Sequence, residues 1–573
     1  MGRIILLTLM VIFMGHLSFA QEQKAGAPLP VQGRSVIETK FGIVATSQPL
    51  ASMAGVQILE RGGNAIDAAI AANATLGLME PTSNGIGGDL FAIVYDAKTK
   101  KLYGLNSSGW SPKAMSRELL ASKGITTMPE RGVWTVTVPG AVAGWNALHE
   151  KFGTLPFSTI LAPAMYYAEN GFPVNQVTAG LWSRSQKFLS GHPNSAATYL
   201  INGQTPKAGQ VFRNPDLAAS LKRIADANGR DGYYKGETAQ KIVDIEKEFG
   251  GVMTLEDLAD FQPEWVTPIS TTYRGWTVYE IPPNTQGIAA LMMLNLMEQF
   301  PMSEYGFHSV KAMHTMIEAK KLAYADMLRY VGDPRFSQIP VEQMLDKNHA
   351  AERAKLIGDR ASCKTEPSVF PGVTGSKGND TIYMSAIDKD GNIVSLIQSN
   401  YSGFGSGLVP KGGGFMLQNR GALFSLQDGH ANLYAPNKRP LHTIIPGFVT
   451  RDGEPWLSYG VMGGAMQPQG HTQVLANMID FGMNPQEAGD FARWQHYGAG
   501  TPDDPDLEPG GEVSFESGIA PVVVDELKRR GHRVTPSRPL SGYGGYQAIQ
   551  RDAVNGCYIA ATEMRFDGQA AGY

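Results

Sequence analysis

The sequence predicts an α+β fold in which helices pack against antiparallel sheets. Two helix-like stretches stand near the start, a mostly helical region extends from about residue 140 to 360, and short β-type runs dominate after residue 381. Four layers, helix over sheet over sheet over helix, would bury both faces of each sheet.

The composition is typical of a soluble globular protein. Of the 573 residues, 43% are hydrophobic and 18% are charged. The length is compatible with several domains, but no Pro/Ser-rich linker interrupts the middle, so one large domain and two domains both stay open. The net charge of -4 gives no broad attraction to nucleic acid or anionic lipid, so neither is an expected partner.

The first twenty residues have the pattern of an export signal. Arg3 precedes a short apolar stretch, and "SFA" places small residues where a signal peptidase cleaves. We therefore expect residues 1–20 to be a signal peptide cut after Ala20, and the mature protein to be periplasmic or secreted. An uncleaved anchor is the alternative, but the apolar run is short for a membrane span.

Two helices are predicted at the start of the mature chain. Residues 50–63 have apolar side chains at helical spacing and end on paired glycines, and residues 64–81 begin with the candidate cap Asn64. The second stretch is alanine-rich on nearly every side, which predicts a helix packed inside the protein. Residues 90–108 are typical of two strands around a polar turn.

The longest helical pattern covers residues 309–334, and the texture changes after residue 381. There "TIYMSAI" and "NIVSLIQS" are predicted to be strands joined by the hairpin turn "DKDG". Further β-type runs are "GFMLQN", "TIIPGFVT", "PWLSYGV" and "GCYIAAT".

Metals and cofactors are not expected. The histidines lack a metal-ligand spacing, and "NGIGGDLF" does not match a phosphate-binding loop. Cys363 and Cys557 are too few for a disulfide framework, and whether they pair stays open.

Thr381 stands between a polar loop and a strand-like run. Within a chain its hydroxyl is a poor nucleophile, but an N-terminal threonine carries an α-amine, with a pKa of about 7.7 to 8.0, that can take the hydroxyl proton. Cleavage between Asp380 and Thr381 would expose that amine, and the glycine-bearing "VTGSKGND" can bend for self-cleavage. Alternatively, Thr381 is only the first residue of a strand.

Separated motifs in the same order resemble γ-glutamyltransferases (glutathione hydrolases), which are N-terminal nucleophile hydrolases. They include "TIYMSAIDKDGN", "EAKKLAYADMLRYVGDPRF", "PNKRPLHTIIP", "GVMGGAMQPQ" and the final "AAGY". The resemblance implies an αββα core, self-cleavage, and an acyl-enzyme on Thr381 without a cofactor. It also implies a large chain (21–380) and a small chain (381–573) that associate in one αββα domain.

The resemblance also implies positions for the catalytic groups. The family's second hydroxyl falls on Ser399, and its oxyanion hole falls on Gly463 and Gly464, whose backbone N–H groups can approach an oxyanion closely. The alternatives are a solvent-facing strand serine and an ordinary glycine turn.

The substrate pocket departs from the family pattern. The stretch that matches the arginine binding the substrate α-carboxylate is "NSSGWSP", with Ser108 at or near the arginine's place. The paired serines correspond to His442 and Thr443. On the amino-binding side, the asparagine, glutamine and aspartate fall on Tyr401, Arg420 and Leu423.

These changes remove the usual contacts to the α-carboxylate and α-ammonium of an amino-acid substrate. In particular, a cation beside a substrate ammonium is repulsive. Arg420 suggests an acyl group that ends in a carboxylate and has no neighbouring ammonium. This pocket is similar to the cephalosporin-acylase-like branch of the family. A structural ion pair is the alternative for Arg420, and His442 is expected to be packed and hydrogen-bonded rather than a base.

Three functions therefore stay open. The first is glutathione hydrolysis or γ-glutamyl transfer, and the second is hydrolysis of another small-molecule amide, such as a dicarboxylic acyl amide. The third is an exported binding protein that has lost turnover. Thr381, Ser399 and the glycine pair argue against the third.

Overall fold

The computed structural model describes residues 33–369, 382–498, 510–538 and 540–573. The predicted signal peptide and the predicted cleavage pair, Asp380 and Thr381, lie outside these residues. Among the described helices, none combines the length and the apolar character that a membrane crossing needs.

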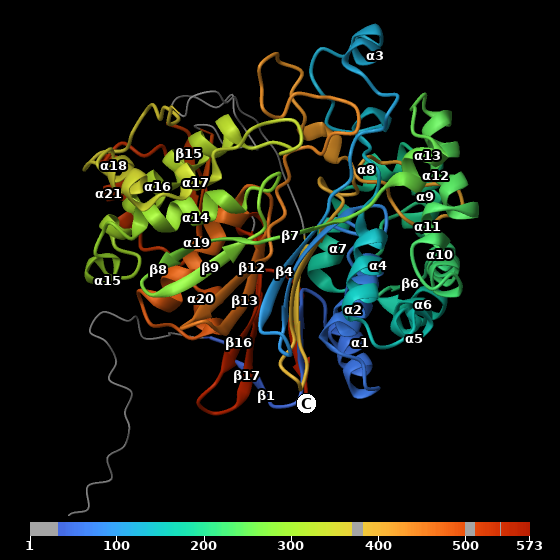
Figure 1. Cartoon of the computed structure of the whole chain (residues 1–573), viewed down its shortest axis with the longest axis horizontal. Coiled ribbons are helices and arrows are strands. Elements are labelled where there is room, and N and C mark those ends of the chain that lie inside the picture. The colour runs from blue at the N-terminus through green and yellow to red at the C-terminus, as the bar shows by residue number, and fades with distance from the viewer. Residues whose placement is uncertain (1–32, 370–381, 499–509, 539) are drawn as a thin grey trace, which may run out of the picture.

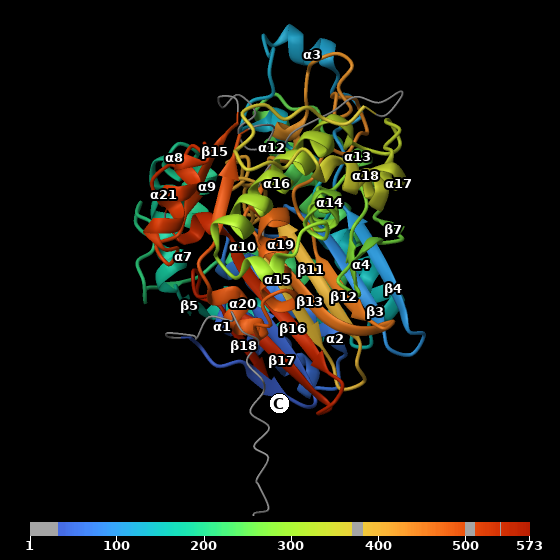
Figure 2. The ribbon, with the colours of Figure 1, turned by 90° about the vertical axis from the view of Figure 1, so that its left-hand side faces the viewer.

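Two seven-stranded antiparallel sheets form the centre, with helices on both outer faces (Figures 1 and 2). The predicted four-layer αββα arrangement is therefore confirmed. The first sheet has the order β1 (Ile37–Thr39), β17 (Cys557–Thr562), β16 (Gly545–Asp552), β13 (Glu454–Met462), β12 (Gly447–Arg451), β9 (Trp276–Glu280) and β8 (Ile269–Tyr273). The second has the order β18 (Gln569–Gly572), β2 (Ile43–Thr46), β10 (Ile382–Ile387), β11 (Ile393–Ser399), β3 (Asp89–Asp96), β4 (Lys101–Ser107) and β7 (Glu264–Val266).

The two sheets pack through an apolar layer built by strand alternation. Tyr383, Ile397 and Phe91 of the second sheet meet Phe448 and Ile549 of the first. Their sequence neighbours point the other way, into the core beneath the helices. Odd-numbered positions of β10, β11 and β3 therefore face the space between the sheets.

The helices on the outer face of the second sheet include the two predicted near the start. The Asn64 side chain accepts hydrogen bonds from the N–H groups of Ile66 and Asp67, which confirms the predicted cap. The helix that follows is buried along nearly its whole length, as its alanine-rich sequence predicted. This group comprises α1 (Pro49–Glu60), α2 (Ala65–Met79), α4 (Ala141–Phe152), α5 (Phe157–Ile160), α6 (Ala162–Asn170), α7 (Gln176–Ser183), α8 (Gln186–Ser190), α9 (Pro193–Tyr199), α10 (Pro215–Asp226), α11 (Asp231–Tyr234), α12 (Gly236–Glu248) and α13 (Leu255–Asp260).

The other helices cover the first sheet, apart from α3 (Arg117–Ser122), which stands at the top of Figure 1. The long predicted helix is α16, capped by the Ser309 side chain. This group comprises α14 (Gly287–Met297), α15 (Met302–Tyr305), α16 (Val310–Tyr330), α17 (Val341–Leu345), α18 (Lys347–Ala354), α19 (Met466–Ile479), α20 (Pro485–Asp490) and α21 (Pro521–Arg529). Two small ribbons pair β5 (Phe172–Pro173) with β6 (Val211–Phe212) and β14 (Trp494–Tyr497) with β15 (Glu512–Phe515).

Two details correct the predictions from sequence. The mostly helical middle also contains β7, β8 and β9, which extend the sheets. The run "GFMLQN", predicted to be a strand, is irregular, because its backbone bonds to loops: Leu417 N–H to Leu408 O (3.0 Å) and Gln418 N–H to Gly87 O (3.0 Å).

Cys363 and Cys557, whose pairing the sequence left open, are both free thiols.

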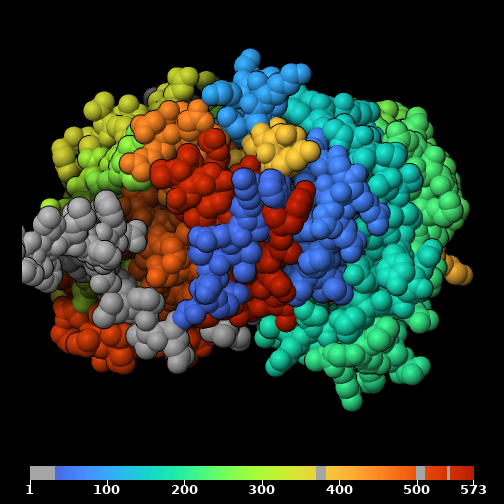
Figure 3. Space-filling view, turned by 90° about the horizontal axis from the view of Figure 1, so that it is seen from below, coloured from blue at the N-terminus to red at the C-terminus, as the bar shows by residue number. Residues whose placement is uncertain are grey.

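Both sheets combine strands from before residue 370 with strands from after residue 381. β10 and β11 lie between β2 and β3, and β18 pairs with β2 at the sheet edge. Figure 3 shows the end of the molecule where the blue N-terminal and red C-terminal residues lie side by side. There the Phe41 N–H donates to the carbonyl of Tyr573, at 2.9 Å.

Candidate active site

The candidate site lies where β11 ends and β3 begins. Ser399, the last residue of β11, pairs with Asp89, the first residue of β3, and both side chains are fully buried. Ile382 pairs with Gln398, so Ser399 lies one step beyond the first described residue of β10. Burial contradicts the alternative that Ser399 faces solvent. Its Oγ accepts the N–H of Tyr401 at 2.8 Å.

Asp89 is the centre of the site, and the reasoning from sequence missed it. Its Oδ1 accepts hydrogen bonds from Gly109 N (2.8 Å), Gly140 N (3.2 Å) and Gln418 Nε2 (2.8 Å). Its Oδ2 lies 3.0 Å from His442 Nε2. The donors come from segments far apart in the chain, so the carboxyl draws several loops together.

The electrostatics of the pair follow from burial. Burial raises the pKa of Asp89 to about 6, although the positive charge of Arg420 and the donated hydrogen bonds oppose that rise. Burial also lowers the pKa of His442 well below its usual range, and Arg420 adds to this effect. The imidazole is therefore neutral near pH 7.

The tautomer of His442 follows from its neighbours. The N–H of Ile444 points at Nδ1, at 3.4 Å, so Nδ1 is the acceptor and Nε2–H donates to Asp89. Both ring nitrogens are engaged inside the protein. The expectation that His442 is packed and hydrogen-bonded is confirmed, and that it is not a base stays a prediction.

Arg420 meets two other predicted pocket residues. It begins the short 3-10 helix Arg420–Leu423 and is completely buried. Its Nη1 donates to Thr443 Oγ1 at 2.7 Å, and its guanidinium lies over the Tyr401 ring, 4.6 Å from the centroid. The Tyr401 backbone has φ 80°, a conformation that a non-glycine residue adopts only when its surroundings hold it there.

Ser108 lies beside this cluster. Its Oγ donates to Asn106 Oδ1 at 2.7 Å, and Asn284 Nδ2 lies 3.3 Å from it. The next residue, Gly109, donates to Asp89, and the backbone carbonyl of Asn284 accepts the His442 N–H at 2.7 Å. The Arg439 guanidinium is part of the same network, because its Nε donates to the Ser108 carbonyl at 3.1 Å. Ser108 is thus part of a buried polar network that includes a cation.

Gly463 and Gly464 form the turn between β13 and α19, with φ values of 125° and 62°. A Cβ on Gly463 would come within 3.0 Å of the Gly544 backbone, so the close approach requires glycine. In the part of the chain that the structure describes, neither glycine N–H donates a hydrogen bond. Two such groups in front of a helix N-terminus suit a developing oxyanion.

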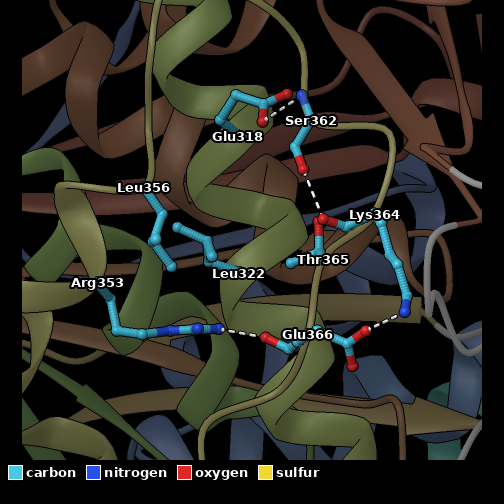
Figure 4. A pocket seen from close by; sticks show the side chains of 8 residues that line it. All are labelled: Glu318, Leu322, Arg353, Leu356, Ser362, Lys364, Thr365 and Glu366. Carbon is cyan, nitrogen blue, oxygen red and sulfur yellow. Dashed lines mark hydrogen bonds and ion pairs between the residues drawn. The ribbon is translucent and has the colours of Figure 1, made fainter.

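Two other features lie outside this cluster. A cavity of about 240 Å³ opens between α16, α18 and residues 362–366, and none of the cluster residues lines it (Figure 4). Nearby, His314 Nδ1 and His532 Nε2 are 2.8 Å apart, and Glu318 completes a trio of metal-ligand types. The buried Lys321 ammonium lies 2.7 Å from Glu318, so this carboxylate already has a cationic partner.

Known proteins resemble the chain along nearly its whole length. A family model described as Gamma-glutamyltranspeptidase matches residues 51–573. Over 543 residues the chain is 36% identical to the Glutathione hydrolase-like YwrD proenzyme of Bacillus subtilis, covering 94% of this chain and 99% of that protein. Over 558 residues it is 33% identical to the Glutathione hydrolase proenzyme of Escherichia coli, covering 94% and 93%.

A solved structure agrees with these relatives. The crystal structure of a cephalosporin acylase from Bacillus halodurans superposes with a TM-score of 0.87 at 43% identity, covering 96% of this chain and 98% of that one. The family match spans well over half of the chain, and fold and sequence agree. The chain therefore belongs to the gamma-glutamyltranspeptidase family and is an N-terminal nucleophile hydrolase, an amide hydrolase or acyltransferase.

Proposed function

We propose that the protein cleaves itself between Asp380 and Thr381 and then hydrolyses amides whose acyl group ends in a carboxylate and lacks an α-ammonium. The observation that carries this substrate class is the buried Arg420, which bonds Thr443 and lies over Tyr401 where the family clamps an amino acid. A guanidinium favours a carboxylate and disfavours an ammonium.

The proposed chemistry needs no cofactor. The Thr381 α-amine takes the hydroxyl proton, and Oγ1 attacks the amide carbonyl carbon. The N–H groups of Gly463 and Gly464 stabilise the tetrahedral oxyanion, and Ser399 is the assisting hydroxyl. Collapse breaks the C–N bond, and the amine leaves with the proton. Water, or an acceptor amine, then attacks the acyl-threonine ester and releases the acyl group and the threonine hydroxyl.

The same proposal fixes the chain organisation. Residues 1–20 are removed on export to the periplasm or the medium, 21–380 form the large chain, and 381–573 form the small chain within one αββα domain. The word proenzyme in the names of the B. subtilis and E. coli relatives supports the cleavage. The two sheets, each of which combines strands from before and after residue 381, support lasting association of the two chains.

Cleavage is tested by intact mass under denaturing conditions and by N-terminal sequencing. The purified protein should contain a large chain that ends at Asp380 and a small chain that begins at Thr381. The Thr381→Ala variant should stay uncut and inactive, because it lacks the nucleophile. A fully active single chain would contradict the proposal.

The substrate class is tested by a paired kcat/KM measurement on a glutaryl and a γ-glutamyl amide with the same leaving group. A charge-assisted contact contributes about 1.5 to 3 kcal/mol, so the glutaryl amide should be preferred about tenfold to a hundredfold. Arg420→Gln should remove much of that preference. A wild-type preference for the γ-glutamyl amide would favour glutathione hydrolysis instead, and a cut protein inactive on both would favour a binding role.

A further inference from the structure

Gln286 connects the two halves of the candidate site. It precedes α14 and is completely buried. Its side-chain Nε2 donates to the carbonyl of Thr443 at 2.6 Å and to the carbonyl of Gly464 at 2.8 Å. Its backbone N–H donates to the carbonyl of His442 at 2.9 Å. One residue therefore holds both the pocket segment and the glycine turn.

The glycine turn needs such support because glycine has few steric limits on its backbone. The Met466 N–H holds the Gly463 carbonyl at 3.0 Å, and this fixes the peptide plane that carries the Gly464 N–H. The next carbonyl, that of Gly464, accepts from the Gln467 N–H at 3.1 Å and from the Gln286 side chain. The orientation of the turn thus depends partly on a side chain from another segment.

The chemistry of the amide explains why glutamine suits this position. A side-chain amide nitrogen has two N–H donors, and each of the two carbonyls takes one of them. A glutamate at position 286 would present oxygens to both carbonyls, and an alanine would leave both without this partner. Thr443 in turn accepts from Arg420, so the link reaches the proposed acyl pocket.

We propose that Gln286 is a positioning residue: by holding the Gly464 carbonyl, it fixes the position of Gly464, and with it the Gly464 N–H, relative to the acyl pocket. This inference rests on the proposed function of the same site. A misplaced oxyanion donor weakens the transition state more than the ground state, so the loss should appear mainly in kcat. For Gln286→Ala we expect kcat to fall about 10- to 100-fold, whereas KM changes less than about threefold.

The first measurement compares wild type, Gln286→Ala and Gln473→Ala on whichever of the two amides the wild type prefers. Gln473 is a matched control, since it is also buried and its Nε2 donates to two carbonyls, those of Gln469 (3.1 Å) and Trp494 (3.0 Å). Rates are expressed per cut chain. If Gln286→Ala does not cut itself, Gln286→His, which keeps one donor, replaces it and should show a smaller loss of kcat.

The second measurement separates positioning from general support of the pocket. An alkyl boronic acid with a distal carboxylate forms a tetrahedral adduct with the threonine hydroxyl, whereas glutarate occupies only the acyl pocket. In Gln286→Ala the boronate affinity should fall in parallel with kcat/KM, and the glutarate affinity should stay within about threefold of wild type.

The outcomes are distinct from those of the proposed function. An uncut or inactive wild type would refute the proposed function itself. An active wild type together with an unchanged kcat in the Gln286 variants would overturn only the positioning role. Equal losses of boronate and glutarate affinity would also overturn it, because Gln286 would then merely support the pocket.

Discussion

Two buried charge clusters in this protein behave in opposite ways. In the structural cluster, Arg565 contacts Glu563 at 2.7 Å and Glu516 at 2.6 Å, and Arg493 contacts Glu563 at 3.0 Å. Despite its complete burial, the pKa of Glu563 is lowered to about 2, because the two arginines outweigh desolvation. This cluster ties β17 and its following turn to the β14–β15 ribbon.

The candidate site has the reverse balance. Asp89 is equally buried, but desolvation outweighs the charge of Arg420, and its pKa is raised to about 6. Its other partners are neutral donors. Burial therefore does not decide the protonation of a carboxyl by itself; the number of nearby cations does. A carboxyl that titrates near neutral pH is typical of functional sites.

The largest expected effect comes from breaking the structural cluster. Arg565→Met removes the buried cation that contacts Glu516 and leaves Glu563 with Arg493 alone. Breaking a buried ion pair in this way typically costs about 3 to 5 kcal/mol. Urea unfolding of the purified enzyme should show this loss as a lower free energy of unfolding. Activity per folded molecule at low temperature should be unchanged. If the variant were as stable as wild type, the ion pairs of this cluster would not contribute the expected stability, and the contrast with the candidate site would fail.

The two carboxyls should give pH dependences of opposite sign. Because the folded pKa of Asp89 is about 6 against an ordinary 3.8, its contribution is fully present below about pH 4 and is lost as the pH rises to about 6. For Glu563, about 2 against 4.5, stability is present above about pH 4.5 and is lost as the pH falls towards 2. Each shift corresponds to about 3 kcal/mol.

Unfolding curves at several pH values for wild type, Asp89→Asn and Glu563→Gln check this contrast. Relative to wild type, Asp89→Asn should gain stability between about pH 4 and 6. Glu563→Gln should lose relative stability as the pH rises from about 2 to about 4.5. Two difference curves with the same slope would refute the contrast.

A smaller effect is expected on the pH profile of activity. Protonation of the Thr381 α-amine should already lower kcat/KM below about pH 8. Protonation of Asp89 removes an acceptor from the loops that it joins, so a second acid limb should appear as the pH drops through about 6. Arg420 lowers the pKa of Asp89, so Arg420→Gln should move this acid limb to higher pH. If the midpoint of this acid limb is the same in Arg420→Gln as in wild type, the charge of Arg420 does not influence the pKa of Asp89.

The smallest effect is expected at the surface. Glu454 lies 3.3 Å from Lys100 and 3.2 Å from Arg551, and all three side chains are solvent-accessible. Water screens these pairs, so Glu454→Gln should change the free energy of unfolding by less than about 1 kcal/mol. The same unfolding assay measures it, and a loss as large as that of Arg565→Met would contradict the role assigned to burial.

Local signals in the sequence predicted much of the fold. The Asn64 cap, the helical periodicity of α16 and the turn between β10 and β11 each depend on neighbouring residues, and the structure confirms them. The prediction of a strand at "GFMLQN" was wrong, because this β-type run forms a buried loop whose backbone N–H groups donate to the carbonyls of Gly87 and Leu408. Such tertiary contacts leave no local pattern.

The candidate site, like the fold, was predicted only in part from the sequence. The resemblance to γ-glutamyltransferases identified Ser399, Arg420 and the glycine pair, which the structure brings into one region. Asp89 and Gln286 were missed, because each is defined by partners far away in the chain. The only local signal for Asp89 is its place directly after "GIGG", where a strand begins at a buried glycine loop.

Because both sheets combine strands from before and after residue 381, the sheet topology affects how the two proposed chains can dissociate. Once the proposed cut is made, β10 and β11 still pair with β2 and β3, and β12 still pairs with β9 in the other sheet. The two pieces can separate only if both sheets come apart, so dissociation and unfolding are one event. Over the time of an assay, dilution should therefore not reduce activity per molecule, and pieces made separately should not assemble simply on mixing.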